Sequence, residues 1–426
     1  MRLSLAIIKK TIFIFILFSV LFGVKYKFPI IGSLNSIVIC SLFGIILWIK
    51  KNKTVFKYSD YSIFRLFIII FILFSITSLI NSYIDPYFIK ELVVANIVRF
   101  FAAYLVINLF YKIYSDKLFY NFTNLIAVLV SFQVIISVVS FLFPFIHNYI
   151  SLFTVTSGLT QTKIEGALAV RAIGIGDYVF YGAGVLNCCV LVLISLALTI
   201  SKLKNKQIIK LIFMFIFISF GGIFLSRTTL VGTGIGSLII ITATPSVAYK
   251  NIKYFIIVIG ICTLCLTSFL GTQLGKELNG LREYGLELFD NFINGEGFSS
   301  KSTNHLKEMY VYPSSIKSWV IGDGKWRFGD IYYMHTDVGY LRLIFFFGLI
   351  GLCITIQYFY KIIQLTGKKL NLSVKTFLMP YLALFLILSM KGVTDISLFI
   401  FLLYNLAGFS SITNPIMTPK ALFNQS

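Results

Sequence analysis

The chain is a series of long apolar runs separated by short basic segments, and this pattern constrains its fold more than any other feature. A helix crosses the ~30 Å hydrocarbon core of a bilayer with about 20 apolar residues. Runs of about that length occur near residues 6–24, 30–49, 63–80, 91–111, 121–146, 180–200, 211–225, 228–244, 254–271, 338–360, 376–391 and 397–413. Because barrel strands would alternate over about ten residues, these continuous runs predict an all-α polytopic membrane protein with about 12 transmembrane helices.

The composition argues against a water-soluble fold. Of the 426 residues, 58% are hydrophobic and 12% are charged, whereas a soluble domain has about 45–50% and about 25%. At the N-terminus Arg2, Lys9 and Lys10 precede the uninterrupted apolar stretch 11–24, which is the order of a signal peptide, but no small-x-small cleavage site follows. We therefore expect an uncleaved first span.

The net charge is +21, and the distribution of the basic residues among the loops indicates how the spans are oriented. With the N-terminus placed in the cytoplasm, the inner segments hold 21 of the 37 basic residues and two of the 16 acidic ones. The loops then obey the positive-inside rule, with both termini cytoplasmic. The charge thus favours contact with membrane lipids over a nucleic-acid partner. We also expect no cofactor and no metal, because the sequence has three histidines and no carboxylate cluster.

This orientation divides the chain into three segments. Residues 1–271 would hold transmembrane helices 1–9 and a medium outer loop near 152–179. Residues 272–337 would form a large outer loop, and residues 338–426 would hold helices 10–12 and the cytoplasmic C-terminus. Loops of such length are usually functional or disordered, and the large one mixes aromatic residues, glycine and both charge signs. We expect it to form a small folded cap.

Three arginines, Arg171, Arg227 and Arg282, lie in the predicted outer connections. Arginine makes permanently charged, bidentate contacts to phosphate oxygens, so these residues suit the binding of a pyrophosphate. Each could instead be a solvated residue, a turn cap or half of an exposed ion pair. Arg99 lies within a span, where it would contact a lipid-linked substrate or form a structural ion pair.

The end of the large loop carries groups suited to acid–base chemistry on sugars. His335 has a side chain suited to taking a proton from a hydroxyl, and Asp337 could orient a partner or accept the proton itself. Trp326, Tyr333 and Tyr340 offer flat faces for sugar rings. Any catalysis here is expected to be metal-independent.

These residues and the span pattern resemble the O-antigen and capsular polysaccharide polymerase (Wzy-type) family, which is related to the O-antigen ligases. Arg171 and Gly182, with ten residues between them, match an Arg-x(10)-Gly pattern of such polymerases. Ser-Arg-Thr at 226–228 matches the family's turn between two spans. The most specific match is Gly-Asp-Gly at 322–324, followed by His-Thr-Asp-Val-Gly-Tyr at 335–340 and Gly-Leu-Ile-Gly at 348–351.

The resemblance implies a C-type membrane glycosyltransferase fold in the bacterial inner membrane. Its reaction joins oligosaccharide repeat units carried on undecaprenyl pyrophosphate, on the periplasmic face. By this likeness His335 or Asp337 would be the general base, and Arg171, Arg227 and Arg282 would hold the pyrophosphate. The implied partners are the lipid-linked oligosaccharide, membrane lipids and a separate chain-length regulator.

Two other functions stay open from the sequence. An O-antigen ligase would transfer finished polymer to the lipid A-core, and the sequence separates it poorly from a polymerase. The residues that follow His335 and Thr336, Asp-Val-Gly-Tyr at 337–340, favour the polymerase. A polysaccharide flippase is a transporter and would show two related halves, small outer loops and charges lining a cavity. This chain has a large outer loop and few charges within its spans.

Overall fold

The structure, a computed structural model, describes residues 2–413 except 30–31, 52–57, 115, 156–170, 201–202, 244–250, 254–255, 257–278, 296, 298 and 330. The helices are α1 (Arg2–Leu21), α2 (Ser36–Lys51), α3 (Tyr58–Asn81), α4 (Pro86–Phe88), η1 (Ile89–Val94), α5 (Ala95–Ile113), α6 (Leu118–Leu142), α7 (Pro144–Phe153), α9 (Phe180–Ile200), α10 (Asn205–Leu225), α11 (Thr229–Ile241), α14 (Asn279–Ile293), α15 (Lys301–Glu308), α16 (Ile316–Val320), η2 (Tyr333–His335), α17 (Gly339–Lys369), η3 (Val374–Leu378), α18 (Met379–Ser389) and α19 (Ser397–Thr413). The strands are β1 (Lys25–Phe28), β2 (Gly32–Asn35), β3 (Thr154–Val155), β4 (Arg327–Phe328) and β5 (Ile331–Tyr332).

The described part of the chain is a helical membrane protein. Six of its helices are long and apolar enough to cross a bilayer: Ser62–Asn81, Pro86–Ile113, Leu118–Leu142, Phe180–Ile200, Asn205–Leu225 and Gly339–Lys369. Four shorter apolar helices coincide with further predicted runs, and α1 covers the first one. The run near 254–271 lies outside the described residues, so the number of about 12 spans stays a prediction.

Several helix ends differ from the apolar runs, because hydropathy does not report backbone pairing. The run near 30–49 becomes helical only at Ser36, since Gly32–Asn35 pairs with β1 as an antiparallel strand. The run near 121–146 stops at Leu142, and Pro144 opens the separate helix α7. Proline lacks the N–H that would continue a helix but suits the first position of a new one.

The chain forms two compact units that interleave along the sequence. Unit 1 holds residues 1–39 and 109–300, and unit 2 holds residues 40–108 and 301–426. The predicted large loop is therefore shared, because its residues 279–300 belong to unit 1 and residues 301–337 to unit 2.

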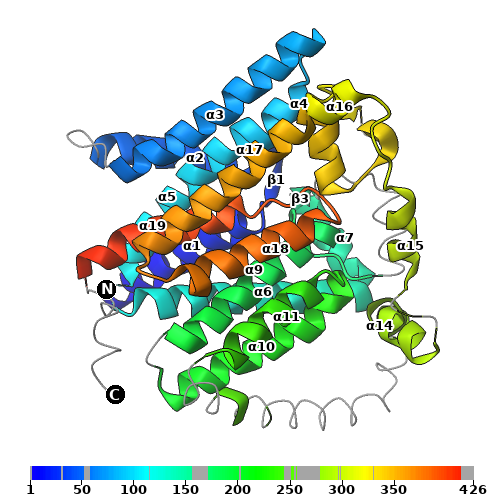
Figure 1. The fold of residues 1–426 in the computed structure, drawn as a ribbon. Coiled ribbons are helices and arrows are strands. Elements are labelled where there is room, and N and C mark those ends of the chain that lie inside the picture. Colours follow the sequence, from blue (N-terminus) through cyan, green and yellow to red (C-terminus); the bar gives the residue numbers. More distant parts are fainter. Residues whose placement is uncertain are drawn as a thin grey trace, which may run out of the picture. The chain divides into compact units, whose positions relative to one another are not determined.

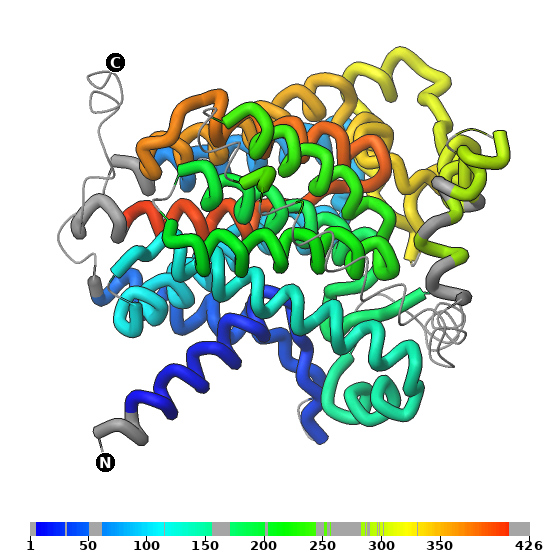
Figure 2. Tube along the Cα trace, turned by 90° about the horizontal axis from the view of Figure 1, so that it is seen from below, coloured from blue at the N-terminus to red at the C-terminus, as the bar shows by residue number. Residues whose placement is uncertain are grey.

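Unit 1 is built around α9, which packs against α6, α10 and α11 (Figures 1 and 2). Nearly every residue of α9 between Ala183 and Leu198 is buried. Small residues let α11 approach closely, and a Cβ on Gly232 would lie 2.3 Å from Cys188 Cα. This is the small-residue packing on which helix association in membranes depends.

Unit 2 is built around the long helix α17, which packs against α3, α18 and α19 (Figure 1). Phe88 stacks on Phe346 with ring centroids 4.1 Å apart, and Phe74 stacks on both of these rings. At Gly348 the helix is broken, because this residue has a φ of 70° and a ψ of −172°. Glycine reaches this conformation without a Cβ penalty.

The segment around Gly322 covers the break in α17. The backbone N–H of Asp323 donates to Phe345 O at 2.6 Å, and that of Gly324 donates to Phe346 O at 3.2 Å. A Cβ on Gly348 would lie 2.1 Å from Val320 O. Gly322 and Gly348 thus allow close backbone contact, and the loop satisfies carbonyls that the helix leaves unpaired.

We expect Gly232→Ala to destabilise unit 1, since the added methyl meets backbone atoms of α9 that cannot rotate away. Overpacking of this kind costs about 1–3 kcal/mol. The measurement is the thermal unfolding midpoint of the purified protein in detergent. Gly234→Ala on the same helix is the matched control, because nothing lies within 4 Å of its added Cβ. Equal midpoints for the two variants would contradict the packing of α11 on α9.

Candidate functional site

Two of the three predicted phosphate-binding arginines share one tyrosine in unit 1. Arg171 Nη1 donates to Tyr284 Oη at 3.4 Å, and Arg227 Cζ lies 4.6 Å from the centroid of the Tyr284 ring. Arg171 also stacks on Phe180, with its Cζ 3.6 Å from that ring centroid. We call Arg171, Arg227 and Tyr284, together with Glu287, the unit 1 arginine cluster.

The turn that carries Arg227 is fixed by α9. Asn187 Nδ2 donates to Thr229 Oγ1 at 3.1 Å, and Cys188 Sγ lies 3.2 Å from Thr228 O. A Cβ on Gly184 would lie 2.6 Å from Ser226 Oγ. The Ser-Arg-Thr turn at 226–228 is therefore held rigidly, which orients the Arg227 side chain.

Helix α14 supplies the remaining groups of the cluster. Glu287 Oε2 accepts from Arg227 Nη1 at 2.5 Å, and the Arg227 side chain is 6% exposed. Among the described residues, the cluster holds Arg171 and Arg227 against the carboxylate of Glu287, a composition that can accept an anion. Arg282 lies on the same helix, but its side chain is outside the described residues.

The aromatic residues predicted to bind sugars lie in unit 2, and Trp326 is not available for that role. It is 2% exposed, its Nε1 donates to Glu91 Oε2 at 2.8 Å, and Arg342 Cζ lies 4.1 Å from its ring centroid. Its backbone N–H also donates to Asp85 Oδ2 at 2.8 Å. Trp326 therefore anchors the loop, because protein atoms cover its indole ring and leave no face open for a sugar.

Tyr333 and Tyr340 are half-buried, and the hydroxyl of each has a partner. Tyr333 Oη donates to Asp323 Oδ2 at 3.2 Å, and Tyr340 Oη donates to Leu386 O at 2.5 Å. Burial, followed by the charge of Asp323, raises the pKa of Tyr333, so its hydroxyl remains a proton donor at neutral pH. Only part of each ring is open to a ligand.

A second pair of arginines lies beside this loop. Arg342 and Arg327 both stack on Tyr332, with their Cζ atoms 3.6 and 4.5 Å from its ring centroid. Glu91 Oε1 accepts from Arg327 Nη2 at 3.0 Å. Arg342 is 7% exposed, and its Nε and Nη2 are buried without a hydrogen-bond partner in the described part of the chain. Such orphaned donors are typical of a site that takes a water or an anion.

Arg342 is not among the residues that the sequence predicts for the site. The available signal was a charge inside an apolar run, which is a functional hypothesis by default because charge at membrane depth is costly. Glu91 was also missed, and its pairing with Arg327 spans more than two hundred positions of the chain.

His335 and Asp337, the predicted acid–base pair, follow in the same loop. His335 is exposed and Asp337 half-buried. Met334 and His335 have φ values of 55° and 53°, a left-handed conformation that costs about 1–2 kcal/mol per non-glycine residue. The buried Thr336 holds the chain here, since its Oγ1 donates to Met309 O at 2.7 Å. Backbone strain that the surroundings enforce tends to mark functional segments.

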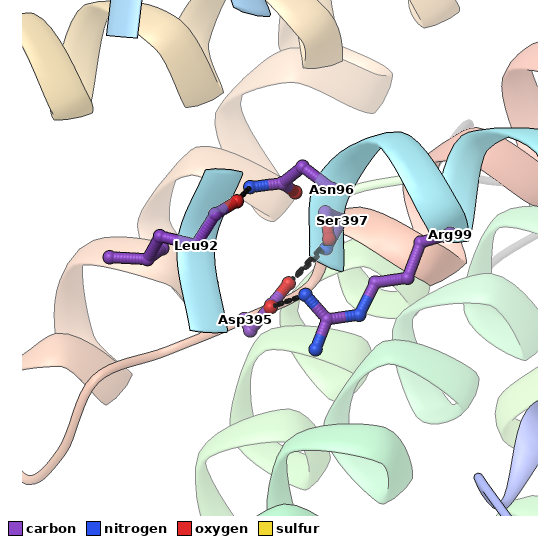
Figure 3. Close-up of polar contacts among 5 residues, drawn as sticks. All are labelled: Leu92, Asn96, Arg99, Asp395 and Ser397. Carbon is purple, nitrogen blue, oxygen red and sulfur yellow. Dashed lines mark hydrogen bonds and ion pairs between the residues drawn. The ribbon is translucent and has the colours of Figure 1, made fainter. Parts of the chain in front are cut away.

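Arg99 forms an ion pair with Asp395 (Figure 3). Of the two roles predicted for Arg99, the structure therefore supports the structural ion pair. Asp395 Oδ1 also accepts from the backbone N–H and the Oγ of Ser397, at 2.9 and 2.5 Å. About a quarter of each charged side chain is exposed. The pair ties α5 to the start of α19.

No family model matches the chain, no curated protein matches it, and no solved structure matches it. The assignment of a function therefore depends on the residues and geometry of the chain itself.

We expect Arg99→Met to lower the free energy of unfolding by roughly 1–3 kcal/mol, because it leaves the Asp395 carboxylate without its cation in a partly buried place. Arg99→Met combined with Asp395→Asn removes both charges, keeps the side-chain oxygen that accepts from Ser397, and is expected to recover most of the loss. The measurement is a double-mutant cycle on thermal unfolding in detergent. Strictly additive effects of the two single changes would contradict the pair.

Proposed function

We propose that this chain is an O-antigen or capsular polysaccharide polymerase of the Wzy type. It joins undecaprenyl-pyrophosphate-linked oligosaccharide units on the periplasmic face of the bacterial inner membrane. The observation that carries the proposal is the unit 1 arginine cluster, in which two arginines chosen for pyrophosphate binding share Tyr284. The span pattern supports a lipid-linked substrate, because an apolar tail can stay in the bilayer while its charged head reaches the cluster.

The proposed reaction makes one glycosidic bond and breaks one. A hydroxyl oxygen of the acceptor unit attacks the anomeric carbon of the donor, and the bond from that carbon to the pyrophosphate oxygen breaks. The bonding electrons leave with the undecaprenyl pyrophosphate, and the hydroxyl proton passes to a base. Negative charge therefore develops on the leaving pyrophosphate, where arginines stabilise the transition state more than the ground state.

The arrangement of Arg227 suits this task. Its guanidinium is buried and already held against Glu287, so it need not be ordered when the substrate binds. Arg171 is placed by stacking on Phe180, which leaves part of its planar fork for phosphate oxygens. Arg282 is proposed as a third contact from the same helix as Tyr284 and Glu287.

The base is proposed to be His335, with Asp337 as the alternative. An exposed imidazole can contact a sugar hydroxyl without displacing protein atoms, and histidine is the side chain that most often acts as a general base. The enforced left-handed backbone at Met334 and His335 fixes the direction in which this side chain leaves the loop.

We expect Arg227→Lys and Arg171→Lys each to reduce polymerisation on the order of 100-fold, because lysine keeps the charge but loses the bidentate fork. The measurement is release of undecaprenyl pyrophosphate by purified protein given lipid-linked repeat units. Lys317→Ala is the matched control, since Lys317 is an exposed cation on α16 and part of neither arginine pair. Unchanged release of undecaprenyl pyrophosphate by both lysine variants would contradict a role for the unit 1 arginine cluster in the reaction.

We expect His335→Gln to reduce the rate about 100-fold or more while the protein still accumulates in the membrane, because a general base contributes about 10²–10⁴-fold. Asp337→Asn, tested beside it, identifies the base, which is the residue whose loss lowers the rate of the chemical step more. His305→Gln is the control, because His305 is exposed on α15 and contacts Glu308. Normal rates for both loop variants would exclude this pair as the base.

Deletion of the coding sequence in its own strain tests the class of function. Surface polysaccharide with a single repeat unit on the core and no ladder is the expected result for a polymerase. Bare core with lipid-linked polymer accumulating would identify a ligase instead. Bare core with single lipid-linked units trapped inside the cell would identify a flippase.

A further inference from the structure

A groove runs between α3 and α17 in unit 2, and none of its lining residues belongs to the candidate functional site. It encloses about 430 Å³, which lies within the roughly 300–1,000 Å³ typical of ligand sites. Its lining combines three cations, polar side chains and aliphatic side chains. The cations are Arg65, Lys361 and Lys368, and the aliphatic side chains include Ile69, Ile70 and Ile354.

The groove is amphipathic along its length. Phe67 lies against Tyr358 and Phe74 against Phe346, so α3 and α17 run antiparallel. The lining positions recur every three or four residues on each helix and form one stripe per helix. In this register the start of α3 lies level with the end of α17, which gathers the cations at one end. Ile70 and Ile354 lie toward the opposite end.

The three cations at this end of the groove, Arg65, Lys361 and Lys368, are exposed. None of them forms an ion pair with a described carboxylate. Lys361 Nζ donates to Gln364 Oε1 at 3.4 Å, which places an amide beside the cations. Three positive charges at the mouth of an apolar groove are complementary to an anionic headgroup that carries an apolar chain.

We propose that this groove binds an acidic phospholipid of the surrounding membrane. The phosphate lies among Arg65, Lys361 and Lys368, and an acyl chain lies along Ile69, Ile70 and Ile354. Free phosphate would use the cations and leave the aliphatic end empty. A lipid uses both ends, and it is already present at the depth where the helices cross. The site is separate from the proposed polymerase reaction and does not depend on it.

The test is native mass spectrometry of the purified full chain in detergent with added dioleoylphosphatidylglycerol or dioleoylphosphatidylcholine. We expect the phosphatidylglycerol adduct to be preferred, and R65Q/K361Q/K368Q to weaken it on the order of 100-fold, since each cation near an anionic lipid surface contributes roughly fivefold. K204Q/K206Q/K210Q is the matched control, because it removes three exposed lysines near the start of α10 in unit 1. Equal weakening by both triple variants would overturn the proposal in favour of general charge attraction.

A second pair of variants tests the apolar end while all charges stay in place. Ile354→Trp fills the groove and is expected to weaken the lipid adduct at least tenfold. Ile350→Trp is the control, because Ile350 is 53% exposed and does not line the groove. Full retention of the lipid by Ile354→Trp, together with its displacement by inorganic phosphate, would show a phosphate site and overturn the lipid proposal. If the triple variant does not elute as a folded protein, Lys368→Gln alone is expected to weaken the adduct roughly fivefold.

Discussion

The break of α17 at Gly348 is the constraint on which unit 2 depends. A helix within a membrane must satisfy every backbone group inside the protein, because lipid offers no hydrogen bonds. Where α17 breaks, the N–H groups of Asp323 and Gly324 donate to the carbonyls of Phe345 and Phe346. The loop after α16 is therefore part of the membrane helix's own hydrogen bonding, and its position is fixed by that requirement.

The position of this loop in turn sets the surroundings of the second arginine pair. Asp85 caps α4 by accepting from the N–H groups of Tyr87 and Phe88, and its other oxygen accepts from the Trp326 N–H. Trp326 is thereby held under Arg342, whose guanidinium lies between that indole and Tyr332. Burying a guanidinium is costly unless each of its N–H groups has a hydrogen-bond acceptor. The Nε and Nη2 of Arg342, which lack an acceptor among the described residues, therefore indicate a place for an anion or a water.

The structure brings together two of the arginines that the sequence proposes for the site and buries one of the aromatic residues proposed there, for identifiable reasons. Both arginines are expected in outer connections, because Arg171 precedes the apolar run 180–200 and Arg227 lies between the runs 211–225 and 228–244. This shared side of the membrane is what the sequence offers for grouping them. Trp326 was assigned to sugar binding because aromatic rings in a loop are usually open, but burial depends on partners such as Glu91 that lie far away in the chain. Arg342 was overlooked because it sits within a run whose average hydropathy hides one charge.

By itself the sequence determined that the chain is a helical membrane protein, where most apolar helices lie and how its charges are distributed along them. These properties are local, because hydrophobic length and charge are sums over neighbouring residues. Only the tertiary structure decided that Arg99 pairs with Asp395, that Tyr284 joins two arginines and that the loop at 322–324 completes a broken helix. Such contacts join residues tens to hundreds of positions apart, and they depend on which helices pack together, a choice that hydropathy leaves open.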